Sequence, residues 1–297
     1  MIFKAFKNHI KQVNGVEINY VIGGSGPPLL LLHGYPQTYC IWHKIADQLA
    51  NAFTVVASDL RGYGDSGNPP TEADHSPYSK REMGKDQILL MQSLGFDQFY
   101  LAGHDRGGRV GHRMALDYPE VILKMAVLDI APTYTMYKTT DMGFAKAYYH
   151  WFFLIQPYDI PEKMIGADPE YFLNKKLGQW GRDETAITKE ARQHYLRCFT
   201  PETIHSSCED YRASATIDLE LDQFDIDTGK KLVCPVLCLW GEKAFVGRKY
   251  NVIEEWKIWS DDVTGLGLPC GHYLPEEAPA ETTNALINFF KPLKPKN

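Results

Sequence analysis

The sequence predicts an α/β fold, in which a mainly parallel β-sheet carries helices on both faces. Along most of the chain, apolar runs typical of buried strands alternate with stretches of helical periodicity, as in consecutive β-α-β units. The 297 residues are 44% hydrophobic and 23% charged, so the chain is long and apolar enough to bury a large core. One aromatic-rich helical segment interrupts the alternation, and we interpret it as an inserted cap.

The first third of the chain is expected to form a hairpin followed by alternating strands and helices. Residues 8–23 alternate apolar and polar side chains around Asn14-Gly15, a signal for a two-stranded hairpin. The wholly apolar run Pro28 to Leu32 predicts a central strand that is covered on both faces. The next segments predict a helix, a strand and a second helix, at 38–49, 53–57 and 79–94, with Ser79 as the N-cap of the last helix.

The chain is organised around a strand, a sharp turn and a helix between residues 99 and 118. The apolar run 99–102 leads into Gly103-His104-Asp105-Arg106-Gly107-Gly108-Arg109, and helical periodicity follows. Such a turn lifts its middle residue, Asp105, out of the sheet and closes only where its neighbours lack bulk, as Gly103 and Gly107 do. The next strand, 122–128, ends in Asp129.

The region from Pro132 to about Phe224 changes to helical stretches that are dense in aromatic residues. A cap inserted there would lie over the carboxyl ends of the strands, where open α/β sheets bind ligands. The alternation then resumes with strands at 236–240 and 263–268 and helices at 252–258 and 281–290, and the tail 291–297 looks loose. We therefore predict a core of residues 1–132 and 224–297 and a cap of residues 133–223.

Charge and composition exclude several classes of function. The net charge of −6 and the isoelectric point near 5.9 argue against nucleic-acid binding, and an anionic substrate would need a local cationic pocket. The apolar runs are too short for a signal peptide or a membrane span, so we expect a cytoplasmic protein that does not bind membranes. The six cysteines lack a Cys-x-x-Cys pattern and are expected to be reduced and buried rather than paired or bound to zinc.

Asp105 at the tip of the sharp turn is the main chemical clue in the chain. Hydrolases with such a turn mostly carry serine there, which needs a base before it becomes nucleophilic. A carboxylate is already an anion at neutral pH and can attack a tetrahedral carbon directly. The product is an alkyl ester, and an activated water can hydrolyse it, whereas serine would leave a stable ether.

Hydrolysis of such an ester needs further groups. His272, in a loop after the last strand, is the candidate general base. Its acidic partner is either Asp129 or Glu242, both at strand ends, and we favour Asp129 because Lys243 follows Glu242 and could neutralise it.

The oxyanion that forms during ester hydrolysis needs backbone N–H donors. We expect them from Arg106, which directly follows the nucleophile, and from Tyr35 in His33-Gly34-Tyr35-Pro36. Arg106 and Arg109 lie one helical turn apart, so two guanidinium groups would stand beside Asp105 and could bind a small carboxylate by forked hydrogen bonds.

Together these residues resemble the branch of the α/β-hydrolase superfamily that has an Asp nucleophile, and the resemblance covers the whole chain. It implies an eight-stranded, mostly parallel sheet with an inserted helical cap, and the chain order nucleophile, acid, base. His104-Asp105-Arg106-Gly107-Gly108-Arg109 is similar to the motif of haloacetate (fluoroacetate) dehalogenases. Relatives that act on epoxides and haloalkanes commonly have Trp directly after the nucleophile, where this chain has Arg106.

The resemblance also implies how the leaving halide is held and which reaction follows. Donors from His150, Trp151 and Tyr211 would stabilise the departing halide. The expected reaction converts haloacetate to glycolate and halide, without metal or organic cofactor. The expected partners are a small anionic 2-haloacid and water, with a homodimer possible. An epoxide hydrolase is the alternative enzyme, and a ligand-binding protein on a hydrolase fold is the alternative of another class.

Overall fold

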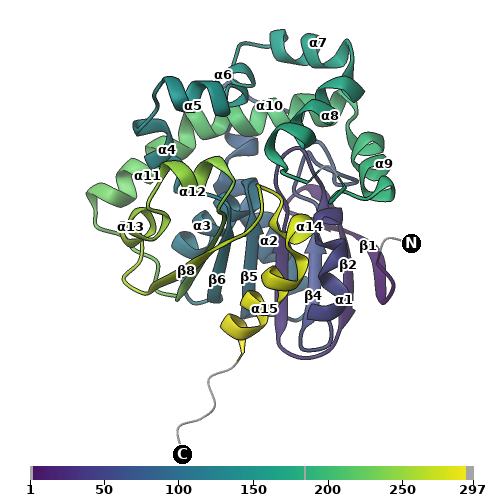
Figure 1. The fold of residues 1–297 in the computed structure, drawn as a ribbon, viewed down its shortest axis with the longest axis vertical. Coiled ribbons are helices and arrows are strands. Elements are labelled where there is room, and N and C mark those ends of the chain that lie inside the picture. Colours follow the sequence, from purple (N-terminus) through teal and green to yellow (C-terminus); the bar gives the residue numbers. More distant parts are fainter. Residues whose placement is uncertain (1–2, 184, 292–297) are drawn as a thin grey trace, which may run out of the picture.

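An eight-stranded sheet forms the centre of the computed structural model, which describes residues 3–183 and 185–291 (Figure 1). Its order is β1-β2-β4-β3-β5-β6-β7-β8; β2 is antiparallel to β1 and β4, and the remaining neighbours are parallel. The predicted mostly parallel sheet is confirmed. The strands are β1 (Phe6–Val13), β2 (Val16–Gly24), β3 (Pro28–Leu32), β4 (Thr54–Ser58), β5 (Phe99–His104), β6 (Ile122–Leu128), β7 (Val236–Gly241) and β8 (Val263–Leu268).

The predicted hairpin and the central strands lie where the sequence placed them. Asn14 and Gly15 both have positive φ angles, 46° and 76°, as the tight turn between β1 and β2 requires. The leucines of β3 are fully buried on both faces of the sheet, which explains the wholly apolar run. The loose tail was predicted for 291–297, and all of it beyond Lys291 lies outside the described residues.

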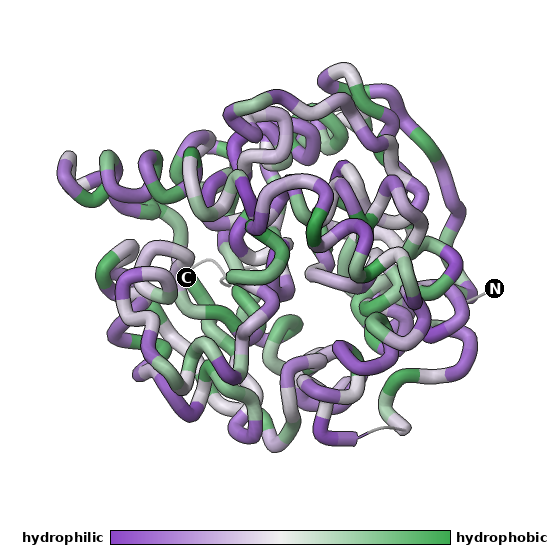
Figure 2. The backbone as a smooth tube through the Cα atoms, turned by 90° about the horizontal axis from the view of Figure 1, so that it is seen from above, coloured by the Kyte–Doolittle hydropathy of each residue, from purple (hydrophilic) through white to green (hydrophobic). Residues whose placement is uncertain are grey.

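The core helices cover both faces of the sheet. On one face α2 (Lys80–Ser93), α3 (Arg106–Asp117) and α13 (Val252–Lys257) pack in one hydrophobic cluster. The opposite face is covered by α1 (Ala46–Leu49), α14 (Leu274–Glu277) and α15 (Pro279–Phe290) in a second cluster. In Figure 2 hydrophobic and hydrophilic residues alternate along peripheral helices, as expected where one side of a helix packs inward.

The single helix predicted for 38–49 was wrong. The structure has a 3-10 helix, η1 (Tyr39–Lys44), followed by the short α1, and Thr38 caps the first turn by accepting from the Cys40 N–H. Cys40, Ile41 and Trp42 are all fully buried, although they follow one another directly. Three consecutive residues of a 3-10 helix point in three directions around its axis, so their full burial means that this turn is enclosed on all sides.

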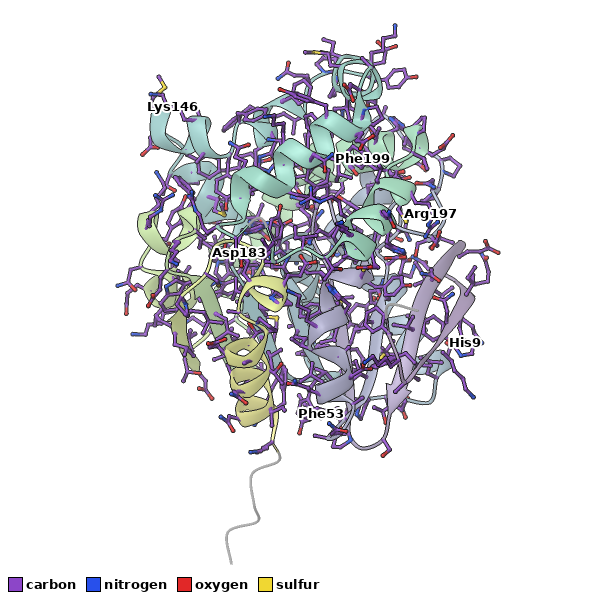
Figure 3. All side chains as sticks on the ribbon, turned by 45° about the vertical axis from the view of Figure 1, so that its right-hand side comes forward. His9, Phe53, Lys146, Asp183, Arg197 and Phe199 are labelled. Atoms are coloured by element: carbon purple, nitrogen blue, oxygen red, sulfur yellow. The ribbon has the colours of Figure 1, made fainter. Side chains whose placement is uncertain are left out.

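Helices inserted between β6 and β7 lie over the carboxyl ends of the strands, at the top of Figure 1. Figure 3 shows Arg197 and Phe199 in this layer and His9 and Phe53 in the sheet layer below. The insertion begins at Thr133, and its last helix ends at Asp227, a few residues beyond the predicted boundary. Its helices are α4 (Thr133–Lys138), α5 (Met142–Ala147), α6 (His150–Phe153), α7 (Ile160–Gly166), α8 (Pro169–Trp180), α9 (Lys189–Cys198), α10 (Pro201–Ala215) and α11 (Ile217–Asp227).

Three short core elements were not predicted, namely η2 (Ser76–Tyr78), α12 (Phe245–Lys249) and α14. The predicted burial of the cysteines is confirmed, because all six are buried, and none of them forms a disulfide in the structure. Among the described residues, no helix is both long and apolar enough to cross a membrane.

Candidate active site

The sharp turn between β5 and α3 holds Asp105 in a strained backbone conformation. Its φ and ψ are 46° and −115°, a region that residues with a side chain rarely adopt. Gly103 and Gly107 make the turn possible, because a Cβ at Gly103 would lie 2.5 Å from the Gly107 backbone. A Cβ at Gly107 would lie equally close to the backbone oxygen of His33. The strain is therefore held by the close packing of β3, β5 and α3.

The Asp105 carboxylate contacts the loop that follows β3. Its Oδ1 accepts a hydrogen bond of 3.0 Å from the Tyr35 backbone N–H. Gly34 allows this approach, since a Cβ there would lie 2.4 Å from the Asp105 Cβ. Burial raises the pKa of Asp105, but the charges of His272 and Arg109 more than offset burial and leave that pKa below its ordinary value. The carboxyl group is therefore an anion at neutral pH.

His272 connects Asp105 to a second buried carboxylate. Its Nδ1 lies 2.6 Å from Oδ2 of Asp129, whose Oδ1 accepts from the Gly241 N–H at 3.0 Å. The other ring nitrogen, Nε2, faces Oδ2 of Asp105 at 4.0 Å. Burial lowers the pKa of His272, but the bond to Asp129 and the negative charges of Asp129 and Asp105 together outweigh burial, so the net shift is upward. The structure thus brings together the favoured set, whereas Glu242 is exposed.

Arg106 reaches into the cap and is ion-paired there. Its Nε and Nη2 donate to the two carboxylate oxygens of Asp210 at 2.8 and 2.6 Å, and Nη2 also donates to the Ser214 hydroxyl at 2.5 Å. Lys80 contacts the same carboxylate. Only Nη1 of Arg106 is buried without a partner. Arg106 therefore has an acidic partner in the cap, and Nη1 is the part of its guanidinium that remains for the predicted contact with a substrate carboxylate.

Arg109 is buried in a different way. Its Nη1 donates to the Ala131 carbonyl and the Thr133 hydroxyl at 3.1 and 2.9 Å, and its Nε has no partner. No carboxylate of residues 3–183 and 185–291 lies within 4.0 Å of this guanidinium. Asp105 is the acidic residue whose charge acts most strongly on it. A buried cation without a direct counter-ion is costly, so this site favours binding of an anion.

The three residues expected to hold the leaving halide lie close together in the cap. Three of their polar atoms are buried and have no hydrogen-bond partner in the part of the chain that the structure describes, namely His150 Nδ1, Trp151 Nε1 and the Tyr211 hydroxyl. The Tyr211 ring lies 5.6 Å from the His150 ring and 6.3 Å from the Trp151 ring, measured between centroids. Burial keeps the pKa of His150 well below its ordinary value and that of Tyr211 well above, so both are neutral.

The arginines and this donor cluster share one space. The Arg106 guanidinium lies 4.1 Å from the centre of the Tyr211 ring, and the Arg109 guanidinium lies 4.7 Å from the Trp151 ring. Tyr35, whose backbone N–H is the candidate oxyanion donor, packs its ring 5.4 Å from the ring of Tyr211, measured between centroids. All the predicted site residues are therefore brought together around Asp105.

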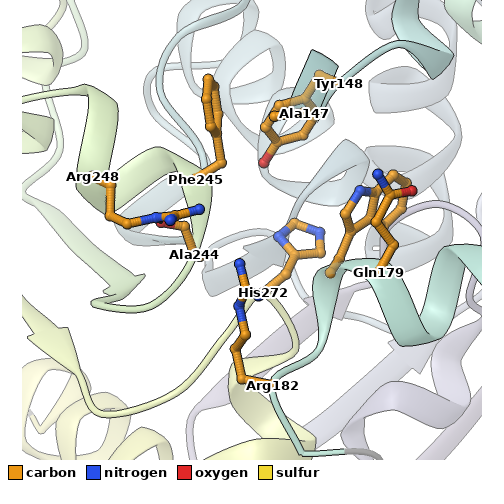
Figure 4. A pocket seen from close by; sticks show the side chains of 9 residues that line it. Ala147, Tyr148, Gln179, Arg182, Ala244, Phe245, Arg248 and His272 are labelled. Atoms are coloured by element: carbon orange, nitrogen blue, oxygen red, sulfur yellow. The ribbon is translucent and has the colours of Figure 1, made fainter. Parts of the chain in front are cut away.

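A pocket of about 200 Å³ opens beside His272 (Figure 4). Trp180 and Tyr148 of the cap form part of its wall, and the Trp180 ring lies 5.6 Å from the His272 ring. Arg182 and Arg248, both exposed to solvent, also line it. The pocket gives access to the imidazole that faces Asp105.

Sequence reasoning missed two residues that shape the site. Trp180 seemed to be one of many cap aromatics, and only its place beside His272 distinguishes it. Asp210 directly precedes Tyr211 in the sequence, and this position was a signal that it lies near the site. Its partner Arg106, however, lies 104 residues away in the chain, so the ion pair itself could not be predicted.

One cluster among the described residues has the composition of a metal site, formed by Asp65, His194 and Cys198. Both oxygens of Asp65 already accept from Arg197, at 2.7 Å each. This ion pair occupies the only carboxylate of the cluster, so we assign it no metal.

Comparisons with known proteins agree with this geometry. Residues 27–279 match the family model of the alpha/beta hydrolase fold. A fluoroacetate dehalogenase from Burkholderia sp. is 45% identical over 97% of this chain and 95% of its own. A soluble epoxide hydrolase from Corynebacterium sp. is 33% identical, covering 97% and 98%. The crystal structure of an α/β hydrolase from Nostoc sp. PCC 7120 superposes with a TM-score of 0.95 at 57% identity, covering 97% and 99%. The chain is a hydrolase that belongs to the α/β-hydrolase superfamily and, within it, to the haloacetate dehalogenase family.

Proposed function

We propose that this protein is a haloacetate dehalogenase that converts haloacetates, fluoroacetate among them, to glycolate and halide through an ester of Asp105. The observation that carries the proposal is the buried guanidinium of Arg109, which lacks a carboxylate partner among the described residues and lies in the field of the Asp105 anion. A substrate carboxylate would supply that partner and would meet the free Nη1 of Arg106 as well. Similarity to a fluoroacetate dehalogenase supports the same assignment.

The first step is displacement of halide. Oδ1 of Asp105 is held by the Tyr35 N–H, so we assign the attack to Oδ2. Oδ2 forms a bond to the α-carbon of the substrate while the carbon–halogen bond breaks, and the halide leaves with the bonding electrons. Charge that develops on the halide would be stabilised by the unpartnered donors of His150, Trp151 and Tyr211. Holding the substrate carboxylate on the arginines aligns the α-carbon with Asp105.

The second step is hydrolysis of the ester. Neutral His272 accepts a proton from water through Nε2, while its Nδ1–H bonds to Asp129 and stabilises the charged imidazole. The water oxygen attacks Cγ of Asp105, and the negative charge that forms on Oδ1 is stabilised by the backbone N–H groups of Tyr35 and Arg106. The bond between Cγ and the alkyl oxygen then breaks, and His272 returns the proton to glycolate. One carboxylate oxygen of Asp105 leaves in the product, and the water oxygen replaces it.

Epoxide hydrolysis is the second candidate. It needs an acid that protonates the ring oxygen, and the buried hydroxyls of Tyr137 and Tyr211 have no partner in the structure. The chain is also 33% identical to a soluble epoxide hydrolase. A neutral epoxide would, however, leave the Arg109 charge without a direct partner, so we place this reaction second.

Assays with three substrates decide between the two. Purified protein is incubated with fluoroacetate, chloroacetate and styrene oxide, and released halide, glycolate and diol are measured. We expect halide and glycolate in equal amounts from the haloacetates. Diol formation without halide release would replace the first proposal by the second.

A further inference from the structure

The pocket beside His272 has two arginine side chains at its opening. Arg182 follows the cap helix α8, and Arg248 lies in the core helix α12. In Figure 4 the two side chains extend from different walls toward His272. Both residues are exposed, so an ion arriving from solvent meets them before it meets the imidazole.

Each of these arginines is oriented by a backbone carbonyl of the same short loop after β7. Arg182 Nε donates to the Lys243 carbonyl at 3.2 Å, and Arg248 Nε donates to the Ala244 carbonyl at 3.1 Å. Within residues 3–183 and 185–291, no acceptor pairs with the terminal N–H groups of either guanidinium. The carbonyls of two consecutive residues thus position one arginine of the cap and one arginine of the core at the same pocket opening.

The charges of this pair are not offset by direct ion pairs within the described residues. Neither guanidinium lies within 4.0 Å of a carboxylate there. The nearby carboxylate of Glu277 accepts instead from the backbone N–H groups of Gly271, Tyr273 and Arg182. Two cations that converge on one small pocket repel each other, and an anion between them would remove that repulsion. The arrangement is notable because the chain as a whole carries a net charge of −6.

We propose that Arg182 and Arg248 form an entrance site that binds the carboxylate of the anionic substrate before it reaches Asp105. This proposal rests on the proposed function, in which the substrate is a haloacetate. It adds an earlier binding step at the pocket opening, before the substrate reaches Asp105. Forked hydrogen bonds from a guanidinium suit a carboxylate, and an exposed cationic pair raises the encounter rate of anions in a way that salt screens.

The test compares Arg182→Gln/Arg248→Gln with wild type in chloroacetate turnover at increasing ionic strength. We expect kcat/KM of the double variant to fall about tenfold at low ionic strength and to approach wild type at high ionic strength, with kcat unchanged. Chloroacetamide, which is neutral, should be turned over equally by both proteins. Lys7→Gln/Lys11→Gln, which removes two exposed charges from β1, is the matched control and should behave as wild type.

A second readout needs no turnover. Trp180 lines the pocket and is only partly buried, so its fluorescence should be quenched by iodide, and Trp180→Phe identifies its contribution. Iodide should quench Trp180 less in the double arginine variant, whereas neutral acrylamide should quench both proteins alike. Equal iodide quenching together with an unchanged salt dependence would overturn the entrance site. Failure of wild type to release halide would instead overturn the proposed function, and the quenching result would still decide whether the opening attracts anions.

Discussion

His272 lies between two carboxylates that act on it in different ways. The bond of 2.6 Å to Asp129 orients the ring, whereas Asp105, 4.0 Å from the other nitrogen, acts through its charge. Both carboxylates raise the pKa of His272 against the opposite effect of burial. Ester formation removes the Asp105 charge, so the imidazole becomes easier to deprotonate at the step that needs a neutral base.

Asp105→Asn tests this electrostatic coupling without chemistry. Asn keeps the oxygen that accepts from Tyr35 but removes the negative charge, so the pKa of His272 should fall relative to wild type. NMR titration of the imidazole measures the change, with His272→Ala used to assign the signal. An unchanged or higher pKa would show that Asp105 does not act on this ring.

The two arginines beside Asp105 should differ in a measurable way. Arg109→Gln removes the guanidinium that has no carboxylate partner, so the KM for chloroacetate should rise about tenfold to a hundredfold, the loss of about 1.5–3 kcal/mol of charge-assisted binding. Arg106→Gln also removes one of the two cations that pair with the buried Asp210 carboxylate, the other being Lys80, so it should lower thermal stability as well. Equal losses with chloroacetate and chloroacetamide in both variants would mean that the arginines are structural.

At the level of elements, close packing of α3 on β3 fixes the position of the nucleophile. Gly107→Ala would place a Cβ 2.5 Å from the backbone oxygens of Leu32 and His33, so we expect a destabilisation of about 1–3 kcal/mol. Gly178→Ala in α8 is the matched control, because a Cβ there meets no atom within 4 Å, and it should stabilise by about 0.5–1 kcal/mol. Thermal denaturation measures both changes, and a Gly107→Ala variant as stable as wild type would contradict this role of the turn.

The strands were predictable from sequence because buried strands leave long apolar runs. β3, β6 and β8 have the predicted bounds, and Ser79 caps α2 as expected. The short helices α12 and α14 were missed, because five and four residues are too few for helical periodicity to show. Local patterns thus gave the sheet, but not the short elements that close the site.

At the level of the whole molecule, the site depends on contacts between distant parts of the chain. The turn at Asp105 was recognisable because its glycines are sequence neighbours. The pairing of Arg106 with Asp210 joins the core to the cap across 104 residues, and Lys80 joins the same carboxylate across 130. No local pattern reveals such pairs, so the neutralisation of Arg106 could only be seen in the folded structure.

Covalent attachment of substrate to Asp105 is the central claim, and trapping that ester tests it most directly. His272→Ala should still allow halide displacement but not ester hydrolysis, since the attacking group is the Asp105 carboxylate itself and the charge of Arg109, which lowers its pKa, is retained. After incubation with chloroacetate, intact-protein mass spectrometry should show one added carboxymethyl group, and peptide mapping should place it on Asp105. Asp105→Asn/His272→Ala, treated in the same way, should remain unmodified. An unmodified His272→Ala variant that continues to release halide over many turnovers would contradict the account.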